Sequence, residues 1–182
     1  MDYDSSISYL EEGHNVRITR GGVLYYNTTS AAGGLSLNEL DISAESSYRI
    51  ADYILASLKL INAIDNDDGD LSLKLSGIYA DGDNIVVTFG YACSNVTVVN
   101  DGKSDLFRFE FNSGKLVKAE VALLCATRGK RYEYVPQAWE IDMFNALSKR
   151  TCAFIPAYKI EGNGKTAYVG WNAFAAREGA GE

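Results

Sequence analysis

The sequence has few of the residues that build disulfide frameworks and zinc sites. Its 182 residues include three cysteines and one histidine. Cys93, Cys125 and Cys152 lie far apart and form no CxxC pair, so neither a disulfide framework nor a zinc set is indicated. We expect all three to pack in the interior. One disulfide with a free thiol is the alternative, so the redox compartment stays open.

Motifs of catalysis and cofactor binding are also missing. No GxSxG nucleophile elbow occurs in the chain, so the sequence offers no serine of that kind for His14 to activate. We therefore expect His14 to be a surface histidine. Neither GxGxxG nor GxxxxGK[ST] occurs. The acidic run at 65–70 fails the EF-hand pattern, because Ile64 and Leu75 stand where that loop needs carboxylates. The sequence therefore predicts a protein that is not an enzyme and holds no cofactor and no metal.

Long apolar runs and an excess of positive charge are absent as well. No stretch approaches the roughly 18 apolar residues that cross a bilayer, and Met1–Asp4 is acidic, unlike a signal peptide. We expect a cytosolic protein, or the soluble part of a protein whose anchor lies outside this chain. The net charge of −7 argues against nucleic-acid binding, which needs clustered Lys and Arg.

One basic cluster stands out against this acidic background. Arg128, Lys130 and Arg131 lie close together, and Tyr132 follows them. A solvated loop is the ordinary interpretation of such a run. The functional interpretation is a docking patch for an acidic protein partner, made by Arg128, Lys130, Arg131 and Tyr132.

The residues that are present alternate in short strands separated by glycine turns. Residues 1–13 read as a loosely held arm or short helix, with Ile7, Tyr9 and Leu10 as possible contacts. The first half then predicts strands at 14–20 and 23–26, a helix at 44–62, and strands at 71–79 and 85–99. The second half predicts strands at 106–111 and 116–126, a helix at 137–149, and a hairpin of 151–160 with 165–173.

Each half thus reads as strand, strand, helix, strand, strand. We predict an α+β fold of two tandem ββαββ lobes, each an antiparallel sheet with one helix packed on a face. The arm covers 1–13, the first lobe 14–100 and the second lobe 101–182. The Tyr25–Tyr26 pair must point to opposite faces of its strand, so one of the two can be exposed.

Five stretches resemble the YycH/YycI-type, PepSY-like extracytoplasmic regulatory proteins of Gram-positive bacteria. They are Gly22–Tyr26, Asn84–Tyr91, Phe109–Leu116, Tyr134–Trp139 and the closing hairpin from Ile155 to Trp171. The membrane helix at the N-terminus of such proteins is missing here. The closing motif is only partly reproduced, as Val169-Gly170-Trp171.

The resemblance implies a non-enzymatic regulatory module in a two-component system. Such a module works outside the cytoplasm, is membrane-anchored in the full-length protein, and modulates a membrane sensor kinase or similar partner. Binding would use an exposed sheet face or an edge strand. One alternative is a small-ligand-binding or enzymatic domain of cystatin-like shape, which needs a pocket above about 300 Å³. Another is a secreted protease inhibitor.

Overall fold

The computed structural model describes residues 6–28, 33–43, 47–64, 71–93, 95–100, 103–123, 137–139, 142, 146, 152–160 and 167–175, with the backbone alone for 152–156 and 167–175. In chain order the elements are β1 (Ile7–Glu11), β2 (His14–Ile18), β3 (Val23–Thr28), β4 (Leu35–Ser36), the 3-10 turn η1 (Leu37–Leu40), α1 (Ile50–Ile64), β5 (Leu71–Asp81), β6 (Asn84–Cys93), β7 (Val96–Asn100), β8 (Phe107–Asn112), β9 (Lys115–Ala122), β10 (Cys152–Ile160) and β11 (Ala167–Ala175).

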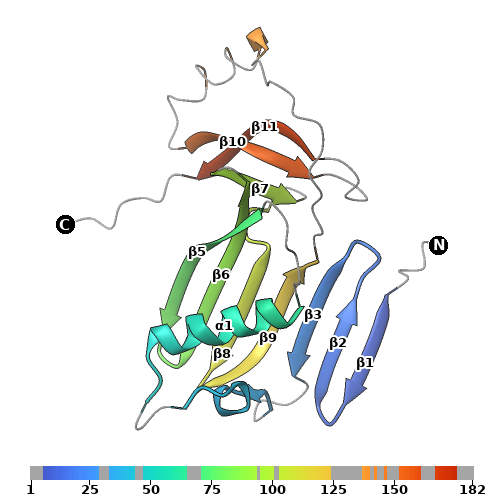
Figure 1. Cartoon of the computed structure of the whole chain (residues 1–182), viewed down its shortest axis with the longest axis vertical. Helices are drawn as coiled ribbons and strands as arrows, with labels where there is room; N and C mark the ends of the chain where they lie inside the picture. The colour runs from blue at the N-terminus through green and yellow to red at the C-terminus, as the bar shows by residue number, and fades with distance from the viewer. Residues whose placement is uncertain are drawn as a thin grey trace.

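Within these residues the strands form one eleven-stranded sheet. Its order is β1-β2-β3-β9-β8-β6-β7-β10-β11, with β4 added on β9 and β5 on β6. The β7–β10 pair is parallel, whereas the neighbouring β6–β7 and β10–β11 pairs are antiparallel. The sheet is therefore mixed and continuous from β1 to β11 (Figure 1).

The predicted fold of two tandem ββαββ lobes is wrong. β9, from the second predicted lobe, pairs with β3 of the first and with β8. β8 in turn pairs with β6, and β10 pairs with β7. An open sheet edge leaves backbone N–H and C=O groups without hydrogen bonds. Strands from the two halves therefore pair with each other and form a single sheet. Alternation specifies the face on which a side chain lies, but not which strand lies next to it.

Most of the local predictions agree better with the structure. Hairpins turn near Gly82 and Gly114, as predicted, and the closing hairpin is β10–β11. The first predicted helix, 44–62, corresponds to α1, which begins later, at Ile50, and ends at Ile64. The predicted arm is wrong, because its residues 7–11 form β1. Of the predicted helix at 137–149, positions 138, 139, 142 and 146 are helical, and most of the others lie outside the described residues.

The core lies between α1 and one face of the sheet. α1 crosses the sheet and contacts β6 and β8 (Figure 1). Its buried Tyr53 packs edge-on against Phe111 of β8, with ring centroids 5.2 Å apart. Phe107, Phe109 and Phe111 alternate along β8 and are each about 1% exposed. Aromatic and β-branched residues at every second position thus bury one face of the sheet against one helix.

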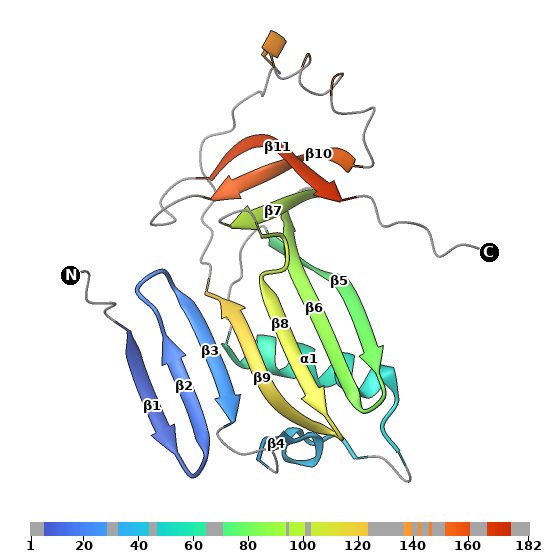
Figure 2. The same cartoon turned by 180° about the vertical axis from the view of Figure 1, so that it is seen from behind.

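The other face of the sheet lies away from α1 (Figure 2). We call it the open face. It carries the side chains that alternate with the core positions, such as Arg108 and Glu110 of β8 and Lys118 and Glu120 of β9. In the described ranges, no helix is both long and apolar enough to cross a membrane.

Candidate functional site

β1 is an open edge of the sheet. It pairs with β2 over all five of its residues, from Ile7 with Ile18 to Glu11 with His14, and no described strand lies on its other side. Every side chain of β1 is exposed. Ile7 is 76% exposed, Tyr9 59% and Leu10 69%. This strand, Ile7–Glu11, is called the β1 edge below.

The turn that joins β1 to β2 determines which backbone groups of the β1 edge are unpaired. Glu12 and Gly13 have φ values of 44° and 89°, which is the positive pair of a type I′ hairpin turn. In such a two-residue turn the flanking pair, here Glu11 and His14, exchanges backbone hydrogen bonds, and bonded pairs alternate from there. The N–H and C=O groups of Ser8 and Leu10 therefore point away from β2.

The β1 edge is apolar on both faces. Ile7 and Tyr9 lie on the side of the sheet that α1 occupies, and Leu10 lies on the open face. Its one charged residue is Glu11, which accepts a hydrogen bond from the Tyr9 hydroxyl. That bond, with a smaller effect of burial, raises the pKa of Tyr9, so the hydroxyl remains a hydrogen-bond donor at neutral pH. Natural edge strands commonly carry Lys, Pro or a bulge that blocks further pairing, and β1 has none of these.

The edge formed by β5 is different. Its pairing with β6 shifts register between Leu75 and Gly77, which is a β-bulge. Lys74 and Asp81 add charge along the same strand. A bulge and a lysine both impair the docking of another strand. β5 also has exposed apolar side chains, such as Tyr79, which is 63% exposed. They lie along a strand whose hydrogen-bonding pattern is irregular.

β2, the strand that pairs with β1, contacts β3 through side chains on both faces of the sheet. On the α1 side, His14 Nδ1 and the Tyr26 hydroxyl are 2.8 Å apart, and the two rings are stacked. Burial raises the pKa of Tyr26, and a hydrogen bond with the backbone of Leu35 partly offsets this. On the open face, the Arg17 guanidinium lies 5.1 Å from the centre of the Tyr25 ring. The two tyrosines do occupy opposite faces, and half-buried His14 has a structural partner.

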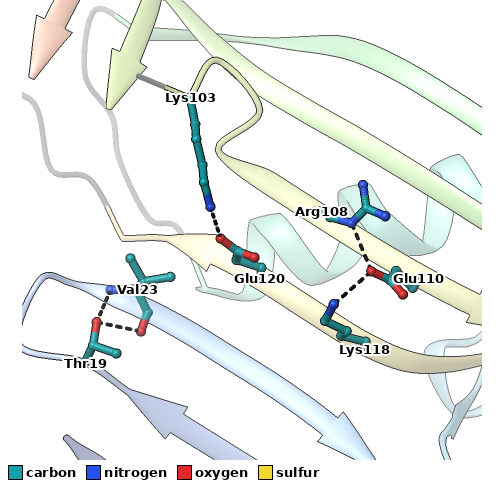
Figure 3. A network of polar contacts seen from close by, with 7 residues as sticks. All are labelled: Thr19, Val23, Lys103, Arg108, Glu110, Lys118 and Glu120. Atoms are coloured by element: carbon teal, nitrogen blue, oxygen red, sulfur yellow. Dashed lines mark hydrogen bonds and ion pairs between the residues drawn. The ribbon is translucent and has the colours of Figure 1, made fainter. Parts of the chain in front are cut away.

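The open face carries a small ion-pair network (Figure 3). Glu110 Oε1 lies 2.9 Å from Arg108 Nε and 3.1 Å from Lys118 Nζ. Lys103 Nζ lies 2.9 Å from Glu120 Oε1, and this hydrogen bond raises the pKa of Lys103. Burial would raise the pKa of Glu110, but the two cations outweigh it and lower that pKa. All of these pairs are partly exposed, so each contributes at most about 1 kcal/mol to folding.

A shallow hollow near the β5 bulge provides little room for a ligand. Its volume is about 190 Å³, and Lys74, Leu75, Ser76, Gly90, Tyr91, Thr97 and Ser104 line it. Typical ligand pockets begin near 300 Å³. The buried Tyr91 hydroxyl has no hydrogen-bond partner among the described residues. Among all the residues that the structure describes, no three His, Cys, Asp or Glu side chains lie close enough together to hold a metal ion.

The predicted docking patch lies outside the described residues. Arg128, Lys130, Arg131 and Tyr132 all fall between residues 123 and 137, where the structure gives no description. That patch therefore remains a prediction. Of the cysteines, Cys93 at the end of β6 is half-buried and carries a free thiol.

The β1 edge is the surface that sequence reasoning assigned to the wrong structure. Ile7, Tyr9 and Leu10 were expected as contacts, but within an arm or short helix. The signal for a strand was present: Ile7 and Tyr9 alternate with Ser8, and Glu12-Gly13 can form a hairpin turn. The serines and acids around this short run weakened that signal.

Comparisons with protein-family models, with curated proteins and with solved structures find no match to this chain. The resemblance to YycH/YycI-type proteins therefore remains a prediction.

Proposed function

We propose that this chain is a non-enzymatic protein-binding module that adds an extended segment of a partner protein to its sheet along β1. The observation that carries the proposal is the free edge itself. The outward backbone groups of Ser8 and Leu10 offer hydrogen bonds to an incoming strand, as in other cases of strand addition. Ile7, Tyr9 and Leu10 offer apolar contacts on both sides of that strand.

The contrast with β5 supports the choice of edge. A partner strand needs a straight run of evenly spaced donors and acceptors. β1 has regular pairing with β2 from end to end, whereas β5 has a bulge in its middle. The mostly exposed Tyr9 also provides a large contact area at little entropic cost, because its side chain has few rotatable bonds.

The regulatory setting is the finer part of the proposal. A membrane sensor kinase or similar protein is the partner, and the module works outside the cytoplasm. The support for both details is the family resemblance of the stretches between Gly22 and Trp171.

Site-specific photocrosslinking in cells of the source organism tests the proposal. A photoreactive phenylalanine derivative replaces Tyr9 in one variant and, as a matched control, Tyr79 on the β5 edge in another. We expect a covalent adduct with a different protein from position 9, little from position 79, and loss of the adduct when Ser8→Pro is added. Ser8→Pro removes an outward N–H and leaves the β1–β2 bonds intact.

The captured protein is then purified, and its binding to the wild-type chain and to Ser8→Pro is measured by calorimetry. Equal adducts from both positions, or an adduct that survives Ser8→Pro, would contradict strand addition at β1.

A further inference from the structure

We infer that the β1–β2 hairpin, residues 7–18, detaches from β3 as one unit while the rest of the sheet keeps its structure. Detachment concerns how β2 is held on β3, so it is independent of what binds the β1 edge. The first support is burial. No residue of β1 or β2 is buried, and none belongs to the hydrophobic core of the described residues. Detachment of the hairpin therefore exposes little apolar surface, whereas separation of β8 from α1 would expose the core.

The second support is the small number of contacts that hold the hairpin. β1 pairs with β2, and β2 pairs with β3 on its other side. By the alternation that begins at the β1–β2 turn, Asn15 and Arg17 direct their backbone N–H and C=O groups towards β3. Two side-chain contacts add to this ladder, one between His14 and Tyr26 and one between Arg17 and Tyr25. The hairpin is thus held by a short ladder and two surface contacts, without a buried side chain.

The β2–β3 turn has the properties of a hinge. On its β3 side, the Gly22 carbonyl accepts a hydrogen bond from Leu123 N–H at 2.7 Å, which fixes Gly22 to the end of β9. On its β2 side, Thr19 bonds to Gly22 and Val23, both within the turn (Figure 3). Between these two points, a Cβ added to Gly21 would have no neighbour nearer than 3.8 Å. The backbone at Gly21 therefore has room to rotate while Gly22 stays in place.

Detachment changes which edge of the sheet is free. In the attached state β2 covers β3 and pairs with its Tyr25 and Asn27. In the detached state the backbone groups of Tyr25 and Asn27 form a free edge. The β1 edge is then lost, because an isolated two-stranded hairpin is only marginally stable in water. β3 keeps its place, since it pairs with β9 and its Leu24 and Tyr26 pack against the core. The hairpin is thus a removable cover of the β3 edge.

Native-state hydrogen exchange of the full chain, followed by NMR at several low urea concentrations, tests the inference. The amides of Asn15 and Arg17 report on the β2–β3 ladder, and the amide of Phe109 reports on the β6–β8 ladder of the core. We expect the protection factors of both hairpin amides to be at least about a hundredfold below that of Phe109. Both should also share one urea dependence that is smaller than that of Phe109 but not zero, because detachment exposes less surface than global unfolding.

Two variants separate the hairpin from the core. His14→Ala removes the contact with Tyr26 and should lower the protection of both hairpin amides by the same factor, without a change at the core amide. Gly90→Ala is the matched control, because its Cβ would crowd the backbone oxygen of Ser104 beside β6. It should lower the protection of the core amide and leave the hairpin amides unchanged. Circular dichroism shows that each variant is folded, and the wild-type measurement tests the inference without them.

Hairpin amides with the same protection and urea dependence as Phe109 overturn the inference, because the hairpin would then unfold only together with the core. Exchange that is independent of urea and differs between Asn15 and Arg17 also overturns it, since β2 would then fray one residue at a time. A loss of protection in His14→Ala that is equal at the hairpin and core amides leads to the same conclusion.

Discussion

Two parts of the same sheet show the same alternation of side chains, but the apolar side chains are buried in one part and exposed in the other. Under α1, Phe109 of β8 is about 1% exposed. On β1, four strands further along the sheet, Tyr9 lies on the same face and is 59% exposed. The difference is the helix, which contacts β6 and β8 and does not extend over β1 (Figure 1). Alternation thus assigns side chains to a face, and only a covering element buries them. An uncovered apolar strand adds little to stability and is available to a partner.

The largest effect expected from this comparison is in the core. Phe109→Ala removes a fully buried ring under α1 and should lower the free energy of unfolding by about 3–5 kcal/mol. Tyr9→Ala should change it by no more than about 0.5 kcal/mol, because Tyr9 is mostly exposed. Urea unfolding of both variants measures the two changes. Similar losses in the two variants would mean that the β1–β2 hairpin belongs to the cooperative core.

Glycines in the two parts of the sheet sharpen the comparison at a smaller scale. A Cβ at Gly90 of β6 would lie 2.3 Å from the backbone oxygen of Ser104. Gly90→Ala should therefore destabilise the protein by about 1–3 kcal/mol, because a tight backbone contact must open. Gly21, in the β2–β3 turn, has nothing nearer to that position than Thr19 Oγ1 at 3.8 Å.

Gly21→Ala is thus the control and should be neutral or slightly stabilising, since it also restricts the unfolded chain. Thermal unfolding of both variants measures the difference. A neutral Gly90→Ala would show that the segment at Ser104 shifts freely and does not pack tightly against β6.

The sequence predicted faces and turns well and neighbours poorly. Phe107, Phe109 and Phe111 alternate without interruption, so their common buried face followed directly from the pattern. The hairpin turns near Gly82 and Gly114 also followed, because turns are local. The pairing of β3 with β9 and the parallel pairing of β7 with β10 join residues that are far apart along the chain. Such pairings depend on which edges remain free once the hairpins form, and alternation carries no information about that.

The candidate site was predicted only in its composition. Ile7, Tyr9 and Leu10 are apolar residues in an acidic, serine-rich stretch, and this marked them as contacts. Their function as an open edge depends on β2 forming one neighbour and on nothing described forming the other. That outcome is set by the order of the whole sheet, so a short stretch of sequence cannot reveal it.

The smallest expected effect on stability concerns the ion pairs on the open face of β8 and β9, opposite to the face that packs against α1. The folded pKa of Glu110 is lowered, although burial alone would raise it, because Arg108 and Lys118 bind its carboxylate. A lowered folded pKa means that this carboxylate stabilises the fold above its unfolded pKa, which is near 4.5, and that the contribution is lost as the pH falls through the folded value. Glu110→Gln should therefore reduce the loss of stability on acidification, by less than about 1 kcal/mol for such partly exposed pairs.

The two cations provide the control for this last prediction. In a chain with Arg108→Gln and Lys118→Gln, burial is the main influence left on Glu110, so its folded pKa should rise above the unfolded value. The carboxylate then destabilises the fold at neutral pH, and adding Glu110→Gln should change the pH dependence in the opposite direction. Urea unfolding between pH 3 and pH 7 measures both backgrounds. The same response to Glu110→Gln in each would mean that the ion pairs of the open face, like the side chains of β1, are solvated and independent of the fold.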